Sequence, residues 1–372
     1  MRGSAEGPTL CLLGHVDTVL ADAAEWSVDP WSGELRDGCV WGRGAVDMKG
    51  QVAAEATAAL SLAGEGWRPE AGELLLAFTC DEETGAVSGA QWLCSEHSER
   101  VRADLVVNEG AGQRMEHDGR RVYGVCVAEK GVFRFKLSVR GRAGHASVPR
   151  IGDNALTRMG ALLTALGERR PAPAPGPEVR LLFGALGLDG DDVEGALAAL
   201  EHDQPELAVL LEPLTGISLA PTLARGGEKI NVIPSHAELE VDCRVPPGLG
   251  EEHVRAAIES VLGENGYELE LLDRIVGNRS PAETPLMDAM SRFIEREDPG
   301  AAVAPMPMSG FSDSHWWREA FPECVVYGFF PQREMGFAEG FPLMHGVDER
   351  IPVADLGFAA SFYSDLIVET LS

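Results

Sequence analysis

Four short apolar runs along the chain are typical of strands that are buried on both faces of a parallel sheet. They cover residues 9–13, 74–79, 103–107 and 324–330. Helical stretches lie between them, most clearly the alanine-rich segment 51–62, and also 90–98. Strands that alternate with helices predict an α/β domain with a mostly parallel central sheet flanked by helices. Ligands of such sheets bind beyond the carboxyl ends of the strands.

The middle of the chain has a different pattern. Residues 132–140 and 237–244 alternate apolar and polar side chains, which suits an antiparallel sheet with one solvated face. Helices are expected at 155–166, 192–200 and 251–263, with a proline-rich connector at 171–177. The pattern then returns to helix, strand and helix. We therefore predict an α+β domain, residues 131–275, inserted into an α/β domain formed by residues 1–130 and 276–372.

Composition excludes several classes of partner. The 372 residues include 31 basic and 59 acidic side chains, a formal charge of −28, which repels nucleic acid and anionic membranes. Seven cysteines without CxxC spacing predict reduced thiols and a cytoplasmic location. No secretory signal opens the chain, and no apolar run approaches the roughly 18–20 residues of a membrane span.

Ionisable side chains follow the predicted strands. His15 and Asp17 come after the first run, two positions apart, so in an extended chain they share a face and the carboxylate can orient the imidazole. The second run ends in the acidic sequence DEETG, and the third ends before Glu109. Asp47 lies in a glycine-rich loop before a helix, and His345 stands late in the chain, in PLMHGVDER.

Such a cluster predicts a metal centre. Carboxylates this close repel one another by several kcal/mol unless a cation compensates the charge. Two histidines and three carboxylates are a nitrogen and oxygen donor set that suits Zn²⁺, and also Co²⁺ or Mn²⁺. The set exceeds the four ligands of one tetrahedral zinc, so we predict two cations bridged by a carboxylate.

Six motifs carry a resemblance to a known family. GHVDTV, GRGAVDMKG, DEETG, GRAGHAS, NVIP and MHGVDER follow one another over most of the chain. In this order they resemble the zinc-dependent family of aminoacylases, acetylornithine deacetylases, succinyl-diaminopimelate desuccinylases and glutamate carboxypeptidases. The resemblance implies a homodimeric metallopeptidase or deacylase, with a catalytic α/β domain and an inserted lid that mediates dimerisation. Its substrate would be an N-acyl amino acid or a peptide, cut at an amide bond near a carboxylate.

The resemblance also implies roles for individual residues of the catalytic domain. His15 and Glu109 would bind one zinc, Glu83 and His345 would bind the other, and Asp47 would bridge the two. Asp17 would orient His15, and Glu82 would be the general base that takes a proton from a metal-activated water.

Further roles follow for substrate binding. His145 in the lid resembles a histidine that reaches across the dimer to polarise the scissile carbonyl. Asn231 and Arg244 match lid positions that hold the substrate's carboxylate or backbone. Ser309 and Gly310 belong to a segment similar to the family's substrate loop, although Phe311 and Ser312 depart from its usual small residues.

Other readings stay open. His145 could be a histidine of a glycine-rich turn, His315 is expected to serve packing, and Glu349 is expected at the surface or as a supporting group. Arg43 and Lys49 are expected only to offset local acidity. Alternative functions are a metal-dependent esterase or phosphatase, or a non-catalytic metal-binding homologue. The intact Glu82 disfavours the last, and a lone Arg244 suits a carboxylate better than a phosphate.

The resemblance finally implies a helix and one or two strands before the His-x-Asp strand, about 50–70 residues that do not precede His15 here. Their lack would uncover one flank of the sheet. We therefore expect the chain as written to be less stable than a version extended upstream.

Overall fold

The computed structural model describes residues 1–372, which form two compact units. The first comprises Met1–Ala128, Pro177–Leu210 and Arg279–Ser372, and the second comprises Glu129–Gly176 and Leu211–Asn278. The helical segment 177–210, which we expected within the insertion, therefore belongs to the first unit. Its helix α5 (Pro177–Ala185) packs against β15 (Ala302–Met308) of that unit and buries Val179, Leu182 and Phe183.

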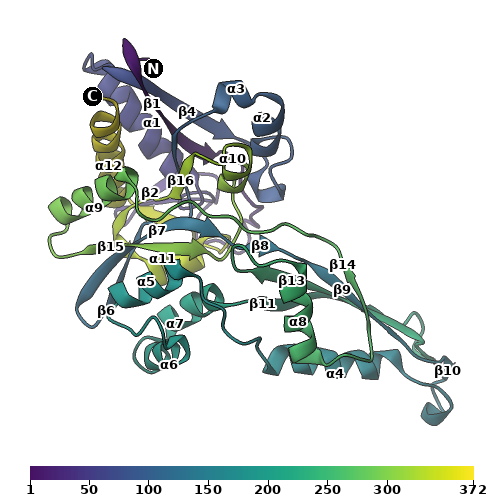
Figure 1. Ribbon diagram of the computed structural model, residues 1–372. Helices are drawn as coiled ribbons and strands as arrows, with labels where there is room; N and C mark the ends of the chain where they lie inside the picture. Colours follow the sequence, from purple (N-terminus) through teal and green to yellow (C-terminus); the bar gives the residue numbers. More distant parts are fainter. The chain divides into compact units, whose positions relative to one another are not determined.

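An eight-stranded sheet forms the centre of the first unit (Figure 1), with the order β17-β6-β7-β16-β5-β1-β4 and with β15 paired to β7. The four apolar runs are confirmed as parallel strands: β1 (Ala5–His15), β4 (Ala71–Thr79), β5 (Leu105–Asn108) and β16 (Val325–Gly328). The sheet is mixed, although most of its described pairings are parallel. A hairpin of β6 (Gln113–His117) and β7 (Arg120–Glu129) turns at Asp118-Gly119, and β7 runs antiparallel to β16.

Alternate residues of β1 face two different layers of helices, as the two-residue period of a strand requires. Leu10 and Leu12 join the apolar cluster that includes side chains of α1, α9 and α12, whereas Cys11 and Leu13 join the cluster that includes side chains of α2 and α10. The helices are α1 (Lys49–Gly64), α2 (Ala90–Glu96), α9 (Pro285–Glu297), α10 (Ser314–Ala320) and α12 (Val353–Leu371). Helices on both faces make this unit an α/β fold and leave the strand ends open for a site.

The second unit is built on an antiparallel sheet with the order β11-β13-β9-β14 and with β8 paired to β13. Its strands are β8 (Gly131–Val132), β9 (Phe135–Arg140), β11 (Ser218–Gly226), β13 (His236–Val245) and β14 (Glu268–Leu271). Every second residue of β13 is buried, beneath helices α4 (Ala155–Glu168) and α8 (Glu251–Leu262). The alternating pattern of the sequence therefore identified this sheet correctly, although the expected strand 132–140 is divided into β8 and β9.

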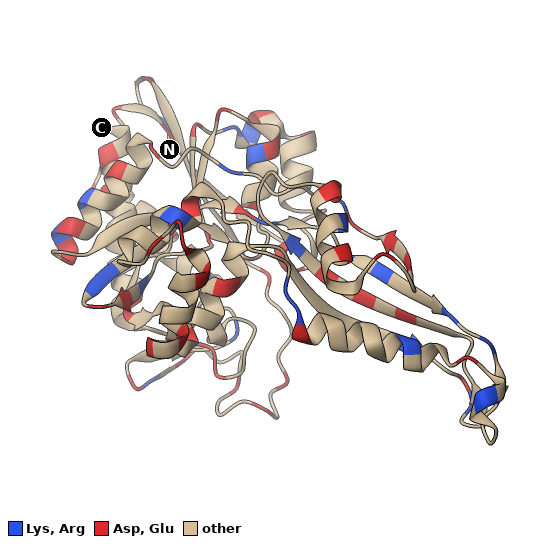
Figure 2. Cartoon of the chain, turned by 60° about the horizontal axis from the view of Figure 1, so that its bottom comes forward, with Lys and Arg blue, Asp and Glu red and all other residues tan.

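Smaller elements complete the two units. The first holds a three-stranded sheet of β18, β3 and β2, and the second holds the pair β10 and β12. Their bounds, with those of the remaining strands and helices, are β2 (Glu34–Arg36), β3 (Cys39–Trp41), β10 (Gly144–His145), β12 (Val232–Ile233), β17 (Gln332–Gly336), β18 (Arg350–Pro352), α3 (Ser98–Val101), α6 (Val193–Asp203), α7 (Pro205–Leu211) and α11 (Phe337–Gly340). Acidic side chains are spread over both units (Figure 2), and no helix combines the length and the apolarity needed to cross a membrane.

A carboxyl group is buried in the core of the first unit. Glu55 of α1 is fully buried, and Gln51 Nε2 donates to Glu55 Oε1 at 2.9 Å. The second oxygen, Oε2, has no hydrogen-bond partner. Burial raises the pKa of Glu55 well above its ordinary value, and the bond from Gln51 offsets this only in part. Burial therefore favours the protonated form of Glu55 in the folded protein.

We expect Glu55→Gln to stabilise the protein increasingly as pH rises. The unfolded glutamate titrates near its ordinary value of 4.5, so above that pH unfolding releases a proton and wild-type stability falls. Glutamine resembles the neutral acid and does not ionise, so its advantage in melting temperature grows from near zero at about pH 4 to a few degrees at about pH 8. Thermal melts across this range measure the effect, with the exposed Glu65→Gln as control. A difference that does not change with pH would contradict the expectation.

Candidate metal centre

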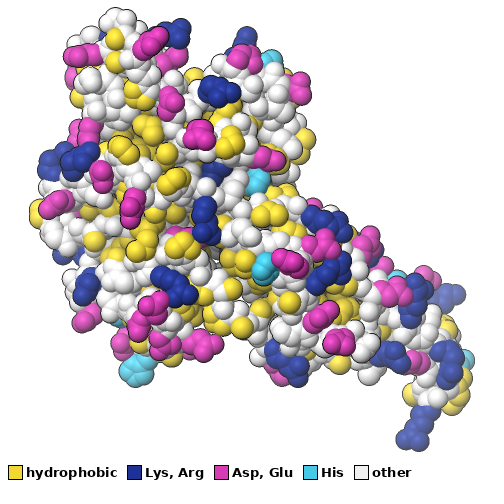
Figure 3. All heavy atoms as spheres, in the orientation of Figure 1, with side chains coloured by type: hydrophobic (Ala, Val, Ile, Leu, Met, Phe, Trp, Pro, Cys, Tyr) yellow, Lys and Arg dark blue, Asp and Glu magenta, His cyan; other side chains and the backbone are white.

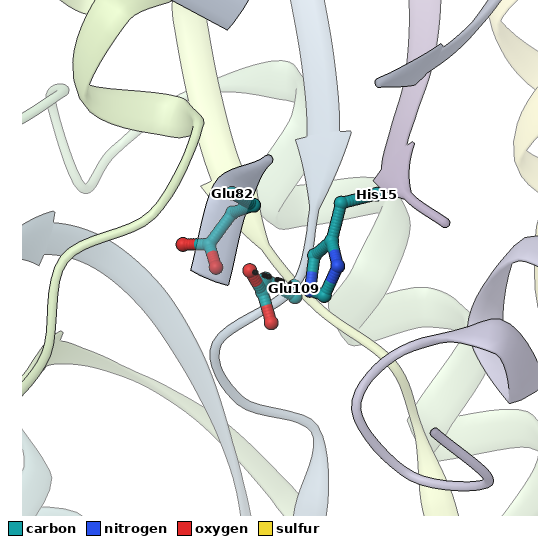
Figure 4. A group of neighbouring side chains, drawn as sticks. All are labelled: His15, Glu82 and Glu109. Carbon is teal, nitrogen blue, oxygen red and sulfur yellow. Dashed lines mark ion pairs between the residues drawn. The ribbon is translucent and has the colours of Figure 1, made fainter. Parts of the chain in front are cut away.

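Three neighbouring strands bring ionisable side chains to one edge of the sheet. His15 is the last residue of β1, Glu109 follows β5, and the short 3₁₀ helix Glu82–Thr84 comes shortly after β4. Because β4 and β5 both run parallel to β1, their carboxyl ends meet at the same edge. The side chains of His15, Glu82 and Glu109 gather around one point there (Figure 4), with His15 Nε2 3.7 Å from Glu109 Oε1.

Asp47 lies between the two histidines. Its Oδ1 is 3.1 Å from His15 Nε2, and its Oδ2 is 3.2 Å from His345 Nε2. His345 Nε2 also lies 3.0 Å from Glu83 Oε2. Each carboxylate oxygen of Asp47 thus lies close to a different histidine, which is the arrangement expected of a bridging ligand. The peptide bond between Asp47 and Met48 is cis.

The five residues predicted as metal ligands therefore converge in the first unit. Potential ligand atoms lie within 4.8 Å of one another in two overlapping groups, one of His15, Glu82 and Glu109 and one of His15, Asp47 and Glu83. His345 adjoins the second group through its contacts with Asp47 and Glu83. Their assignment as ligands remains a prediction.

The electrostatics of the cluster follow from buried charges of like sign. Burial and the neighbouring Glu109 raise the pKa of Glu82 to about 10, and burial and Asp47 raise the pKa of Glu109 to about 7. Burial lowers the pKa of His15, but Glu109 and Asp47 outweigh it and raise the value to about 12. Hydrogen bonds to Asp47 and Glu83 raise the pKa of His345 to about 10. In the chain alone, protons therefore compensate the crowded carboxylates.

This donor set fits divalent cations. Two imidazole nitrogens and several carboxylate oxygens are ligands that zinc accepts, and that cobalt and manganese accept also. A cation binds neutral imidazole and ionised carboxylate, so it would replace the protons that otherwise neutralise the cluster. The crowding of carboxylates around His15 and Asp47 is the structural observation that favours a metal over an ordinary ion-pair network.

Asp17 has a broader role than the predicted orientation of His15. The nearer partner of His15 Nδ1 is the backbone oxygen of Asp17, at 3.0 Å, whereas the carboxylate Oδ1 is 3.5 Å away. The two carboxylate oxygens accept hydrogen bonds from the backbone N–H groups of Glu82 and Glu83, both at 3.3 Å. Asp17 therefore positions the loop that carries both glutamates.

Two residues were underrated from sequence. Glu349 was expected at the surface or as a supporting group, and its complete burial excludes the first of these. It accepts hydrogen bonds from the backbone N–H groups of Gly44, Val46 and Asp47. Arg43, expected merely to offset acidity, is also buried and pairs with Glu349 at 2.8 Å. The sequence signal for a buried acceptor such as Glu349 was the glycine-rich loop, because its backbone N–H groups need hydrogen-bond acceptors once they are buried.

Ser309 and Gly310 follow β15, beside the loop of Glu109. Met308, the last residue of β15, lies against Gly110. Further along the same segment, Ser312 and Ser314 accept hydrogen bonds from Asn108 Nδ2, at 3.3 and 2.9 Å. Because Asn108 directly precedes Glu109, the segment predicted as a substrate loop is tied to a strand that ends at the cluster. His315 is buried and packs against Phe311 and Trp316, as expected.

The remaining predicted residues belong to the second unit. His145 pairs with Val232 between β10 and β12, and the N–H of Ala146 donates to the backbone oxygen of Asn231 at 3.1 Å. These residues lie near the beginning of β13. Arg244 stands near its other end, where it pairs with Asp242 at 2.8 Å. At about 3.3 Å per residue along a strand, the ends of β13 are on the order of 25 Å apart.

Comparisons with known proteins agree with the class that the fold and cluster indicate, an α/β protein with a cluster of side chains able to hold metal ions. The model of the peptidase family M20/M25/M40 matches residues 11–369. A succinyl-diaminopimelate desuccinylase of Rhodospirillum centenum is 30% identical over 97% of this chain and 81% of its own length. The chain belongs to the peptidase family M20/M25/M40, a family of metal-dependent hydrolases, which confirms the resemblance.

Solved structures support the same fold. The M20 metallo-carboxypeptidase Sso-CP2 of Sulfolobus solfataricus superposes with a TM-score of 0.73 and 19% identity, over 99% of this chain and 86% of that one. The YXEP protein of Bacillus subtilis, described as a dinuclear metal-binding peptidase, has a TM-score of 0.56 and 15% identity, over 100% of this chain and 83% of that one. At these identities the likeness concerns the fold.

Proposed function

We propose that the protein hydrolyses an amide bond near a carboxylate in an N-acyl amino acid or a peptide, with two divalent cations, most simply zinc. One observation carries the proposal: Asp47 directs its two carboxylate oxygens toward His15 and His345, while Glu83 and Glu109 flank these histidines. The names of the relatives, a desuccinylase and a carboxypeptidase, support the same bond type.

His15, Asp47 and Glu109 would hold one cation, and Asp47, Glu83 and His345 the other. Bound cations supply Lewis-acid chemistry, which acidifies water and polarises a carbonyl group. Glu82 is the group left to move protons: it takes one from the attacking water and delivers it to the leaving amine. The positive charge of nearby cations favours the ionised form of Glu82 that a base requires.

Residues of the second unit would bind the substrate. We assign His145 to the oxyanion, and Asn231 and Arg244 to the substrate's carboxylate or backbone. Basic side chains gather at the end of the second unit that carries β10 (Figure 3), a location favourable to an anionic substrate on an otherwise acidic chain. Those near β10 and β12 are Arg142, Arg150, Arg225 and Lys229.

Strand β11 supports the proposal of a homodimer formed through the second unit. It is the edge strand of its sheet, and its residues 220–226 are exposed. An exposed edge with unpaired backbone groups readily pairs with another strand, and a second copy of the same chain does so with twofold symmetry. The separation of His145 from Arg244 within one unit fits a site that takes His145 from the second copy.

We expect His145→Ala to lower kcat by about 10²–10³-fold, because that is the usual cost of losing one oxyanion donor. The protein should keep its cations and its fold, since His145 is exposed and its ring is hydrogen-bonded to Ser147, its near neighbour in the chain. Steady-state kinetics measure the loss, with His236→Ala, an exposed histidine of the same unit, as control. Unchanged kcat would remove His145 from the mechanism.

A substrate panel tests the function itself. N-acetyl and N-succinyl amino acids, dipeptides and matched esters would be incubated with protein loaded with zinc, cobalt or manganese. We expect turnover of at least one amide that bears a carboxylate, and none after a chelator removes the metal. Turnover of esters or phosphate esters alone would favour the alternative hydrolases. Metal uptake without turnover of any substrate would favour a non-catalytic homologue.

A further inference from the structure

A buried ion pair contacts the backbone of two residues of the cluster, Asp47 and His345. Arg43 and Glu349 are 4% and 0% exposed, and Arg43 Nη1 donates to Glu349 Oε2 at 2.8 Å. Neither side chain is among the predicted ligands. Isolated buried pairs seldom repay the cost of desolvating two charges, so one with many additional hydrogen bonds points to a positional role.

Glu349 organises the loop that presents Asp47. Its Oε2 also accepts from the N–H of Gly44 at 2.9 Å. Its Oε1 accepts from the N–H groups of Val46 at 2.7 Å and Asp47 at 3.0 Å. One carboxylate thus receives three hydrogen bonds from the N–H groups of a short loop, in addition to the one from the guanidinium. These bonds fix the backbone from which the Asp47 side chain extends.

Arg43 reaches the other side of the cluster. Its Nη2 donates to the backbone oxygens of His345 at 3.3 Å and Gly346 at 2.7 Å. His345 has a φ of 59°, a left-handed conformation that is uncommon for a residue with a side chain and needs support from its surroundings. The guanidinium supplies that support and connects it to Glu349 through the same planar group.

We infer that the Arg43–Glu349 pair positions Asp47 against His345, and so sets the affinity for the cation that these two residues share with Glu83. The inference rests on the proposed two-cation function. The pair acts through the backbone of the ligands: Glu349 holds the N–H of Asp47, and Arg43 holds the carbonyl of His345. Both are positioning residues, because neither reaches the reacting atoms.

Glu349→Gln tests the inference by calorimetric titration of the metal-free protein with Zn²⁺ or Co²⁺. Glutamine keeps the shape but replaces one accepting oxygen with an NH₂ group that faces backbone donors. We expect two cations to bind still, with affinity for one of them reduced by about 10–100-fold, the usual loss when a ligand's supporting group is changed. The absorption spectrum of the cobalt protein should change for the same cation.

Asp355→Asn is the matched control. Asp355 is equally buried and accepts hydrogen bonds from three consecutive N–H groups, those of Arg333, Glu334 and Met335, at 2.8–2.9 Å. We expect it to lower the melting temperature as Glu349→Gln does, but to leave both cation affinities unchanged. Equal affinity losses in the two variants would mean that Glu349 only stabilises the fold, and would overturn the inference.

Arg43→Lys tests the positioning role of the pair if Glu349→Gln does not fold. Lysine keeps the charge opposite Glu349 but lacks the planar group that also reaches His345 and Gly346. We expect weaker binding of one cation only. Wild-type affinities in this variant would overturn the inference while leaving the proposed function intact. A wild-type protein that binds no cation would instead refute the proposed function.

Discussion

Glu82→Ala is expected to lower turnover by about 10²–10⁴-fold while the protein still binds two cations. Glu82 is the one acid of the cluster to which we assign proton transfer, and it comes from a loop held by Asp17 rather than from a strand. Its removal should therefore abolish this proton transfer and leave the five predicted ligands in place.

This variant also distinguishes a base from a ligand. Potential ligand atoms of Glu82, His15 and Glu109 are close enough to share one cation. If Glu82 were a ligand, Glu82→Ala would lose that cation together with activity. Metal analysis of the purified variant separates the two outcomes. Glu99→Gln, which alters an exposed acid of the same unit, should retain wild-type turnover within a few-fold. Wild-type turnover in Glu82→Ala would contradict the assignment of the base.

Asp47→Ala should have an effect at least as large, for a different reason. Asp47 is the only side chain in contact with both His15 and His345. Without it, the two histidines lose their shared partner, and each cation loses a ligand. We expect fewer than two cations per chain and turnover at or below that of Glu82→Ala.

Metal stoichiometry and kinetics measured together test this expectation. Asp22→Ala, which removes an exposed carboxylate from the same unit, controls for the change in charge. If Asp47→Ala retained two cations at wild-type affinity, Asp47 would not be the bridge.

The sequence predicted the parts that depend on local pattern. Apolar runs identified four parallel strands, and their ends located His15 and Glu109, because parallel strands deliver their carboxyl ends to one edge. The alternation of apolar and polar residues identified β13 and its sheet. The family resemblance then assigned roles that spacing could not assign, such as general base for Glu82 and metal ligand for the adjacent Glu83.

Other features depend on tertiary contacts, which produce little recognisable pattern in the local sequence. The hairpin of β6 and β7 was missed although Asp118-Gly119 is a typical two-residue turn, because buried β7 has no alternation to mark it. Segment 177–210 was assigned to the wrong unit because an amphipathic helix does not reveal which core it covers. Arg43 and Glu349 are far apart in sequence, and their acceptors and donors are mostly backbone groups.

The most direct measurement is a crystal structure of the zinc- or cobalt-loaded protein with anomalous diffraction. The account predicts two anomalous peaks per chain, one beside His15 and Glu109 and one beside Glu83 and His345, with an Asp47 oxygen about 2.0–2.2 Å from each. A single peak, or peaks away from these five side chains, would contradict it.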